Sequence, residues 1–275
     1  MAQMPQTIDY SSNWQPGTYG LLANAVGPLA MPDHGSFAGI DFNSDLCGEG
    51  YLYPGICDTT PPAKTFDPCD DPGGCGLTHG LPFWTYVTEQ CAPVGRSLAE
   101  AERRVRRRAM LRQSFMVERA FWGDDAASPG YLQQIGATPL TAEADLVLAM
   151  SALEQDAADN FGLPVMIHVR AGMASRLGAA GLIRPTTGPL FTWKGNKIIV
   201  GDGYAAVDED GDPITPPADA MWATGPVSIW QGDLIVNEPR AGLNRTTNQL
   251  FMLAEQPWII AHECYAATIS VPGAP

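Results

Sequence analysis

The chain has 275 residues, enough to bury one large hydrophobic core or two small ones. Its formal net charge of -14 argues against a general affinity for nucleic acid, because such affinity needs a basic face. No apolar run is long enough to cross a bilayer and the N-terminus shows no signal segment, so we expect a protein made in a cytoplasm, without contact to a membrane.

Glycine and proline are frequent, with 29 and 24 residues, which indicates much irregular or extended structure. Charged residues make up only 17% of the chain, and there are seven tryptophans. This composition is typical of a protein that hides part of its surface against other subunits.

The first third of the chain contains little periodic apolar sequence. Residues 1–35 are predicted to be an N-terminal arm, and residues 36–95 an extended loop region with short strands such as Phe83–Val87. The loop region is acidic, and Lys64 is its only basic residue. Its acidic residues are Asp41, Asp45, Glu49, Asp58, Asp67, Asp70, Asp71 and Glu89.

A basic helix is predicted next, from Ser97, with Glu100 completing a capping box, to the stop at Gly123. The stretch from Arg96 to Arg119 holds half of the 16 lysines and arginines of the chain. Its predicted apolar stripe consists of Leu98, Ala101, Val105, Ala109, Met116 and Ala120. Arg104, Arg108 and Arg112 recur beside this stripe rather than opposite it, so we expect an acidic partner to cover them.

A second helix is predicted over 142–161, with Thr141 as its N-cap and Gly162 as its stop. A strand over 164–169, a short helix ending at Gly181 and a hairpin with its turn at 195–196 follow. The remaining predicted strands are 221–224, 227–231, 234–236, 249–254, 258–263 and 266–271. This order of elements predicts an α+β fold.

Five of the six cysteines fall in the extended loop region: Cys47, Cys57, Cys69, Cys75 and Cys91. They are candidates for disulfides, which would form once the protein leaves a reducing cytoplasm. Two alternatives stay open: reduced cysteines that pack a poor core, and a zinc site with His79, although no Cys-x-x-Cys spacing supports zinc.

Three further patterns resemble catalytic or metal-binding sites, but packing or a solvent-exposed turn explains them better. His262 and Cys264 share a face of a strand, as a hydrolase couple would, but no nucleophile turn accompanies them. The alternating Asp208, Asp210 and Asp212 lack the closing glutamate of a calcium loop. His168, on an apolar strand, is expected to be a core histidine with satisfied hydrogen bonds.

Short structural motifs follow one another in order from about residue 38 onward. They are Cys47-Gly48, 54–57, 83–87, 91–95, 117–122, 223–227, 244–248, 253–255 and 264–267. This order resembles the Hong Kong 97-type fold of tailed-phage major capsid proteins and encapsulin shells, and most of all the capsid-type proteins of actinobacterial phages. The resemblance implies an N-arm (1–35), an extended loop (36–95), a spine helix with the first part of a peripheral domain (96–140), an axial domain (141–236) and closing strands of the peripheral β-sheet (237–275).

In that fold the extended loop of one subunit lies over the spine helix of a neighbour, so the resemblance also implies a contact between subunits. We expect this contact to join the basic side chains of one copy to the acidic side chains of another. These are Arg103, Arg104, Arg107, Arg108 and Arg112, with Asp58, Asp67, Asp70 and Asp71. Two alternatives remain: pairs with Glu100, Glu102 and Glu118 on the same helix, and contacts with phosphates of packaged DNA.

The resemblance implies a major capsid protein of a tailed double-stranded DNA phage, without an active site, cofactor or metal. Copies would assemble as pentamers and hexamers into an icosahedral shell around the genome, so the chain is expected in the virion after synthesis in the host cytoplasm. Decoration, portal or scaffolding proteins would be further partners, and packaged DNA an indirect one. The alternatives are an encapsulin-type compartment shell and, with low weight, a cysteine or metal-dependent hydrolase.

Overall fold

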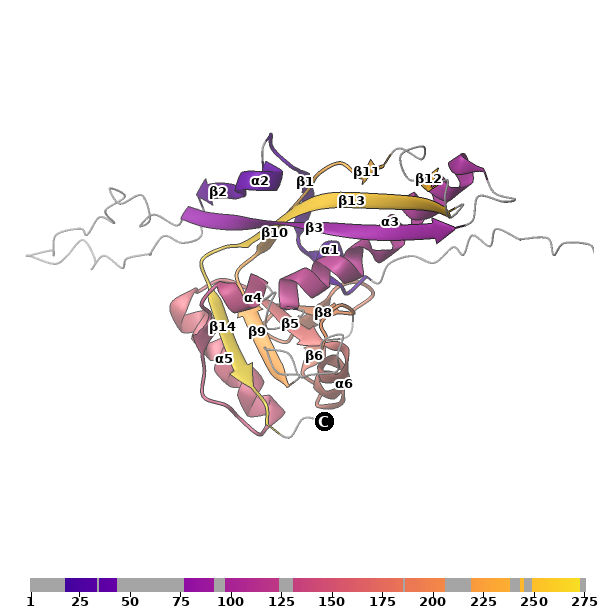
Figure 1. The fold of residues 1–275 in the computed structure, drawn as a ribbon. Coiled ribbons are helices and arrows are strands. Elements are labelled where there is room, and N and C mark those ends of the chain that lie inside the picture. The colour runs from indigo at the N-terminus through magenta and orange to yellow at the C-terminus, as the bar shows by residue number, and fades with distance from the viewer. Residues whose placement is uncertain are drawn as a thin grey trace, which may run out of the picture.

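Two mixed β-sheets, one long helix and several shorter helices form the described part of the chain, shown in a computed structural model (Figure 1). The structure describes residues 18–33, 35–43, 77–91, 97–123, 131–184, 186–205, 219–237, 243–244 and 249–272.

The first sheet is built around strand β13, which spans Gln249–His262. Its strand order is β1-β10-β13-β3-β2, and two short strands, β11 and β12, also pair with β13. These strands are β1 (Val26–Ala30), β2 (Ile40–Asn43), β3 (Leu77–Cys91), β10 (Val227–Gln231), β11 (Ile235–Val236) and β12 (Leu243–Asn244). β3 and β13 pair antiparallel over eleven residue positions, from Cys91 with Leu250 to Leu81 with Ile260, and so form a long ribbon.

The sequence predicts two separate strands, 249–254 and 258–263, because a proline normally interrupts a sheet. The structure instead has the single strand β13 across this region. Pro257 lies where the neighbouring strands are themselves interrupted, since β10 ends opposite Trp258 and β11 begins opposite Glu255. The Pro257 carbonyl oxygen accepts a hydrogen bond from Gly232 N in this gap. The missing proline N–H faces the same gap, because the N–H and C=O of one residue point to the same side of a strand.

The second sheet has the order β4-β14-β9-β5-β8-β7-β6. Its strands are β4 (Thr138–Pro139), β5 (Met166–Arg170), β6 (Ile183–Arg184), β7 (Leu190–Thr192), β8 (Lys197–Gly201), β9 (Ala220–Thr224) and β14 (Ala266–Ser270). The predicted hairpin is present as β7 and β8, with Gly195 at a φ of +99° in its turn.

Both faces of the second sheet are covered. Ile167 and Ile198 belong to a core cluster shared with the helices α5 (Leu146–Asn160) and α6 (Ala171–Ala179). Ile199 and Trp222, on the other face, belong to a cluster with the C-terminal half of helix α3 (Leu98–Trp122). The second sheet is therefore a middle layer between two groups of helices.

Helix α5 begins at Leu146, four residues later than predicted, and Asp145 rather than Thr141 is its N-cap. The Asp145 carboxylate accepts hydrogen bonds from the amides of Val147 and Leu148. The preceding backbone runs beside β14 instead, as Leu140 N donates to Thr268 O and Glu143 N to Ser270 O. The residues just before Leu146, which helix propensity alone assigned to the helix, therefore pair with the edge of the second sheet instead.

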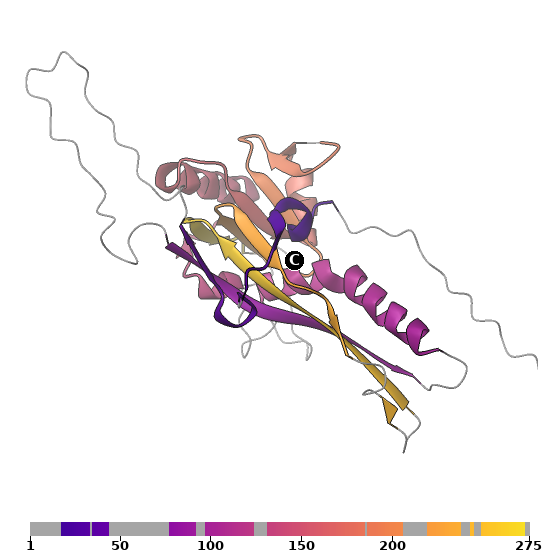
Figure 2. The same cartoon turned by 90° about the horizontal axis from the view of Figure 1, so that it is seen from above.

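Helix α3 confirms the predicted N-cap Ser97, whose side chain accepts from Glu100 N, and the stop at Gly123. It lies along the β3–β13 ribbon, as Figure 2 shows from above. Its buried face continues from Val105 to Val117 and Phe121, whereas the predicted members Met116 and Ala120 are half-buried and Leu98 is exposed. The prediction was wrong at Leu98, the first residue of the helix, whereas Met116 and Ala120 lie at the margin of the buried face because the helix packs on two different sheets along its length.

The N-terminal segment enters the first sheet of its own chain. After the short helix α1 (Leu21–Asn24), strand β1 pairs parallel with β10. Helix α2 (Gly35–Ala38) leads to β2, which pairs antiparallel with the start of β3. All five residues of β1 are exposed, so no burial pattern in the sequence marks this strand.

The two sheets are joined by a pair of strands that pass from one to the other. β9 continues into β10 through Gly225 and Pro226, and β13 continues into β14 through a short turn. The two crossings are hydrogen-bonded to each other, Gly225 N to Tyr265 O at 2.8 Å and Glu263 N to Pro226 O at 3.0 Å. A Cβ on Gly225 would overlap the Glu263 carbonyl oxygen, so this approach requires glycine.

Candidate subunit-contact site on the basic helix

The N-terminal half of α3 packs its small residues against the β3–β13 ribbon. Ala101, Val105 and Ala109 form a core cluster with Leu250 and Met252 of β13. Because these side chains are short, the helix lies close to the strands, and the flanking arginines can reach β3.

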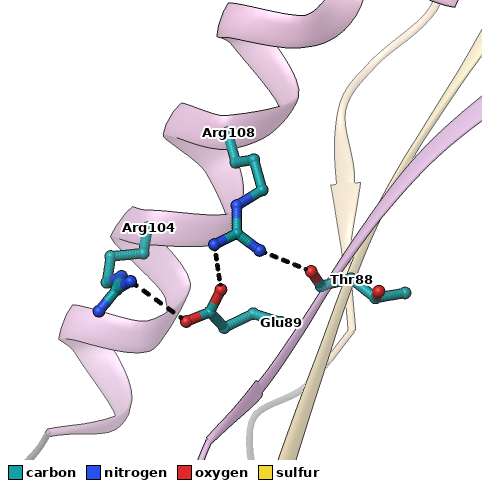
Figure 3. A network of polar contacts seen from close by, with 4 residues as sticks. All are labelled: Thr88, Glu89, Arg104 and Arg108. Atoms are coloured by element: carbon teal, nitrogen blue, oxygen red, sulfur yellow. Dashed lines mark hydrogen bonds and ion pairs between the residues drawn. The ribbon is translucent and has the colours of Figure 1, made fainter.

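One buried carboxylate on β3 meets two of these arginines (Figure 3). Glu89 is only 6% exposed, and its Oε1 lies 3.5 Å from Arg104 Nη2 while its Oε2 lies 2.6 Å from Arg108 Nη2. Arg108 also donates through Nη1 to the Thr88 carbonyl oxygen at 2.9 Å. Three residues of one chain thus form a cluster with a net charge of +1 that binds the ribbon to the helix.

The structure brings together two of the predicted site residues, Arg104 and Arg108, but joins them to Glu89 of the same chain. From the sequence, Glu89 was only one member of the acidic segment. The signal that could identify it is strand alternation, because Thr85 and Glu89 are both buried and lie on one face of β3.

The other predicted basic residues lie in different environments. Arg103 and Arg112 are exposed, and the Arg112 guanidinium lies over the Phe115 ring at 5.9 Å from its centroid. Arg107 is half-buried. Arg106, which was not among the predicted contacts, pairs with Glu102 one turn away at 2.9 Å. The same-helix alternative is therefore realised for Glu102.

The predicted acidic partners Asp58, Asp67, Asp70 and Asp71 lie outside the described residues, as do Cys47, Cys57, Cys69 and Cys75 and the aspartates at 208, 210 and 212. Cys91 is the last residue of β3, paired with Leu250. Contacts that involve the aspartates and disulfides among the five cysteines stay predictions.

Glu118, the third acidic residue of the same-helix alternative, binds backbone groups rather than an arginine of its helix. Its side chain is 1% exposed, and it accepts hydrogen bonds from the backbone amides of Leu21 and Gly203 and from the Ser114 hydroxyl. Burial, which outweighs these hydrogen bonds, raises the pKa of Glu118.

The histidine on the apolar strand β5 is fully buried, as predicted, and both of its nitrogens are satisfied. The Thr224 hydroxyl donates to the Gly225 carbonyl, so it accepts from His168 Nε2 at 2.9 Å. Tyr204 then donates to Nδ1 at 3.1 Å, which makes His168 a neutral Nε2–H tautomer. Burial lowers the pKa of His168 to about 3.

The two residues of the hydrolase alternative are committed to other contacts. The Tyr131 hydroxyl accepts from the backbone N of His262 at 2.9 Å and donates to its Nδ1 at 2.7 Å. Cys264 is disulfide-bonded, although it was not among the cysteines predicted to form disulfides. Its sulfur is therefore not available as a thiolate nucleophile in this state.

The described residues contain neither a helix suited to span a membrane nor a cluster suited to hold a metal ion. Within them, no helix is both long and apolar enough to cross a bilayer. The same residues contain no group of three or more His, Cys, Asp and Glu side chains arranged to hold a metal ion.

Neutralising Glu89 is expected to lower the free energy of unfolding by about 1 kcal/mol, because both guanidinium groups lose their shared carboxylate but stay partly solvated. Glu102→Gln is the control, since its pair with Arg106 is exposed, and it should cost less than about 0.5 kcal/mol. Urea unfolding of Glu89→Gln and Glu102→Gln would measure both. Equal effects would show that the buried cluster adds nothing beyond a surface pair.

No protein-family model and no curated protein sequence matches the chain. Its fold, however, matches solved shell proteins over nearly the full length. The capsid of an empty GTA particle matches with a TM-score of 0.55 at 12% identity, covering 97% of this chain and 94% of the other.

Two further solved structures show the same likeness. A structure from Mycobacterium phage Che8 has a TM-score of 0.52 at 14% identity, with 98% of both chains covered. The SrpI encapsulin from Synechococcus elongatus PCC 7942 has a TM-score of 0.53 at 10% identity, with 96% of this chain and 92% of the other covered. The chain therefore has the Hong Kong 97-type fold that the sequence motifs resemble.

Proposed function

We propose that the chain is the major capsid protein of a tailed double-stranded DNA phage and assembles into a closed shell of pentamers and hexamers. The observation that carries this proposal is the full-length match to a particle capsid and a phage structure, with 94% and 98% of those chains covered. The same two matches cover 97% and 98% of this chain. The shell would enclose the genome in the virion after synthesis in the host cytoplasm, with decoration, portal or scaffolding proteins as further partners.

The exposed apolar surface of the single chain supports assembly. Tyr86 is 65% exposed and Trp193 68% exposed, although aromatic side chains usually lose water contact on folding. Other large apolar side chains with substantial exposure are Trp84, Val147, Leu148, Ile235 and Phe251. They lie on the first sheet and on α5, while Trp193 lies in the β7–β8 turn, as expected for a subunit with neighbours on several sides.

Electron microscopy of the purified protein tests the proposal. Closed shells are expected, and shells that contain DNA after expression with the packaging machinery would identify a phage capsid. Soluble monomers at all concentrations would contradict assembly.

An encapsulin-type compartment shell is the second candidate, favoured by the match to the SrpI encapsulin. Small shells that co-purify with a protein cargo would support it over the phage capsid. A hydrolase is disfavoured by the disulfide at Cys264 and by the hydrogen bonds of Tyr131 to His262.

Within the shell, we propose that the acidic loop region of one subunit meets the exposed part of the basic helix of its neighbour. Arg104 and Arg108 are already bound to Glu89, so the contact would use other arginines of α3 that are exposed. Arg103 and Arg112 are exposed on α3 and meet this requirement. Packaged DNA is the competing anionic partner for the same two side chains.

Reversing both exposed charges, with Arg103→Glu and Arg112→Glu together, is expected to abolish shell formation while the subunit keeps its fold. The reason is that like charges would then face each other at every symmetric contact. Sedimentation and electron microscopy would measure assembly, and circular dichroism the fold. The control is Arg103→Lys with Arg112→Lys, which keeps the charge and should still assemble; normal shells from the reversed variant would refute the proposed contact.

A further inference from the structure

A single buried carboxylate joins three segments that are far apart in the sequence. Glu118 Oε1 accepts from Leu21 N at 2.9 Å and from Ser114 Oγ at 3.3 Å, and Oε2 accepts from Gly203 N at 3.0 Å. Leu21 begins α1, Ser114 belongs to α3, and Gly203 lies in the turn after β8. The side chain therefore connects the N-terminal segment, the long helix and the second sheet.

Two glycines permit this close approach. A Cβ on Gly20 would overlap Glu118 Oε1 itself. A Cβ on Gly203 would meet the Phe115 carbonyl oxygen and lie 2.8 Å from Arg119 N, both of which belong to the α3 backbone. The carboxylate thus lies where two other segments come into direct contact with helix α3. A side chain at Gly20 or Gly203 would push its segment away from the helix.

The N-terminal segment has further anchors at the same place. Val200 N donates to the Tyr19 carbonyl at 2.9 Å, and Lys197 Nζ donates to the Asn24 carbonyl at 3.0 Å. The Leu21 side chain is fully buried in the cluster that also contains Val117. Residues 18–25 are therefore held between α3 and β8.

The groups that donate to Glu118 are all uncharged: two backbone amides and one hydroxyl. Among the described residues, the charged or titratable groups that act on it come from the turn after β8. Asp202 opposes ionisation of Glu118 by charge repulsion, and Tyr204 stays neutral because burial, with the nearby Glu118 charge, raises its pKa. Lys197, on β8, binds the N-terminal segment through the Asn24 carbonyl oxygen.

We propose that Glu118, with the amides of Leu21 and Gly203, forms a proton-linked clasp that holds residues 18–25 more tightly in acid than at neutral pH. When the segment lifts away, water reaches the carboxyl group and its pKa falls toward the ordinary glutamate value of about 4.3. In the closed state burial raises this pKa, with repulsion from Asp202 acting in the same direction. The closed state therefore binds the proton more strongly, and acid favours closure.

The protonated carboxyl group can keep its partners. Each oxygen retains a lone pair for the amide that donates to it, and the Ser114 hydroxyl can accept the new proton instead of donating. Protonation therefore removes the cost of a buried charge without breaking the contacts that hold the segment.

Hydrogen exchange at the Leu21 amide, which donates to Glu118, and at the Val200 amide, which donates to Tyr19, tests the clasp in the full chain when it is measured from pH 8 to pH 4 and corrected for intrinsic exchange. Protection should rise on acidification, by at most about tenfold per pH unit. The rise should occur between the raised pKa of Glu118 in the closed state and its ordinary pKa in the open state. Amides in the β3–β13 ribbon serve as the internal reference for global opening. Glu118→Gln, which cannot ionise, should lose the pH dependence specific to these two amides.

Asp202→Asn provides a second test that leaves the carboxylate in place. Removing the repulsive charge lowers the pKa of the closed state, so the rise in protection should shift to lower pH. Protection of the two amides that falls on acidification, or that follows the ribbon reference at every pH, would overturn the proposal. The outcome does not depend on whether the protein forms a shell.

Discussion

Replacing Gly225 by alanine is expected to lower the free energy of unfolding by about 3 kcal/mol, at the upper end of the usual cost of overpacking. The new Cβ would overlap the carbonyl oxygen of Glu263, and a backbone group cannot turn aside as a side chain can. To relieve the overlap, the two crossings would have to separate and lose the hydrogen bonds from Gly225 N and Glu263 N. Urea unfolding followed by circular dichroism would measure the change.

Gly178→Ala is the matched control for this substitution. Gly178 lies in helix α6, and apart from its chain neighbours and the backbone of its own helix, no described atom lies within 4 Å of the position that an alanine methyl group would take. Because alanine also has the higher helix propensity, the control should be neutral or stabilising by up to about 1 kcal/mol. A Gly225 variant as stable as this control would show that the crossing tolerates a side chain.

Acidification from pH 6.5 to 4.5 is expected to remove at most about 5 kcal/mol of stability through two buried histidines. Burial lowers the pKa of His168 to about 3 and that of His262 to about 4, from 6.5 in the unfolded chain. The unfolded state therefore takes up protons as the pH falls below 6.5, while the folded state does not. Stability is fully present above pH 6.5 and is lost as the pH falls, until the folded histidines are themselves protonated.

Variants separate the contributions to this pH dependence. His168→Gln should reduce the slope of stability against pH, because it removes one of the two titrating groups. Glu118→Gln should make the acid loss steeper, since a carboxyl group with a raised pKa adds stability on acidification and so opposes the histidines. Urea midpoints measured at half-unit intervals of pH provide the test, and a wild-type stability that stays constant from pH 6.5 to 4.5 would contradict the assignment.

Local signals in the sequence were sufficient for several elements. The N-cap Ser97 and the stop at Gly123 delimit α3 correctly, and the turn glycine Gly195 marks the β7–β8 hairpin. In each case the backbone geometry depends on a residue type within the element itself. The fold as a whole followed from the order of motifs, which the solved shell proteins confirm.

Long-range pairing could not be predicted in the same way. Strand β1 has no buried residue, and Pro257 is tolerated in β13 only because two partner strands leave a gap beside it. Glu89 and Glu118 read as ordinary surface acids, and only packing shows that one binds two arginines and the other binds backbone amides. Such roles depend on neighbours that are distant in the chain, which neither propensity nor periodicity records.

The paired crossings between the sheets limit how the subunit can change shape. Each sheet is stiffened by its own ladder of hydrogen bonds, so any rotation of one against the other requires changes in torsion angles near residues 225–226 and 263–265 and a shift of α3, which packs on both sheets. The two crossing strands are hydrogen-bonded to each other there, so they must twist together. Under stress, such a subunit would twist at this short connection while each β-sheet stays rigid.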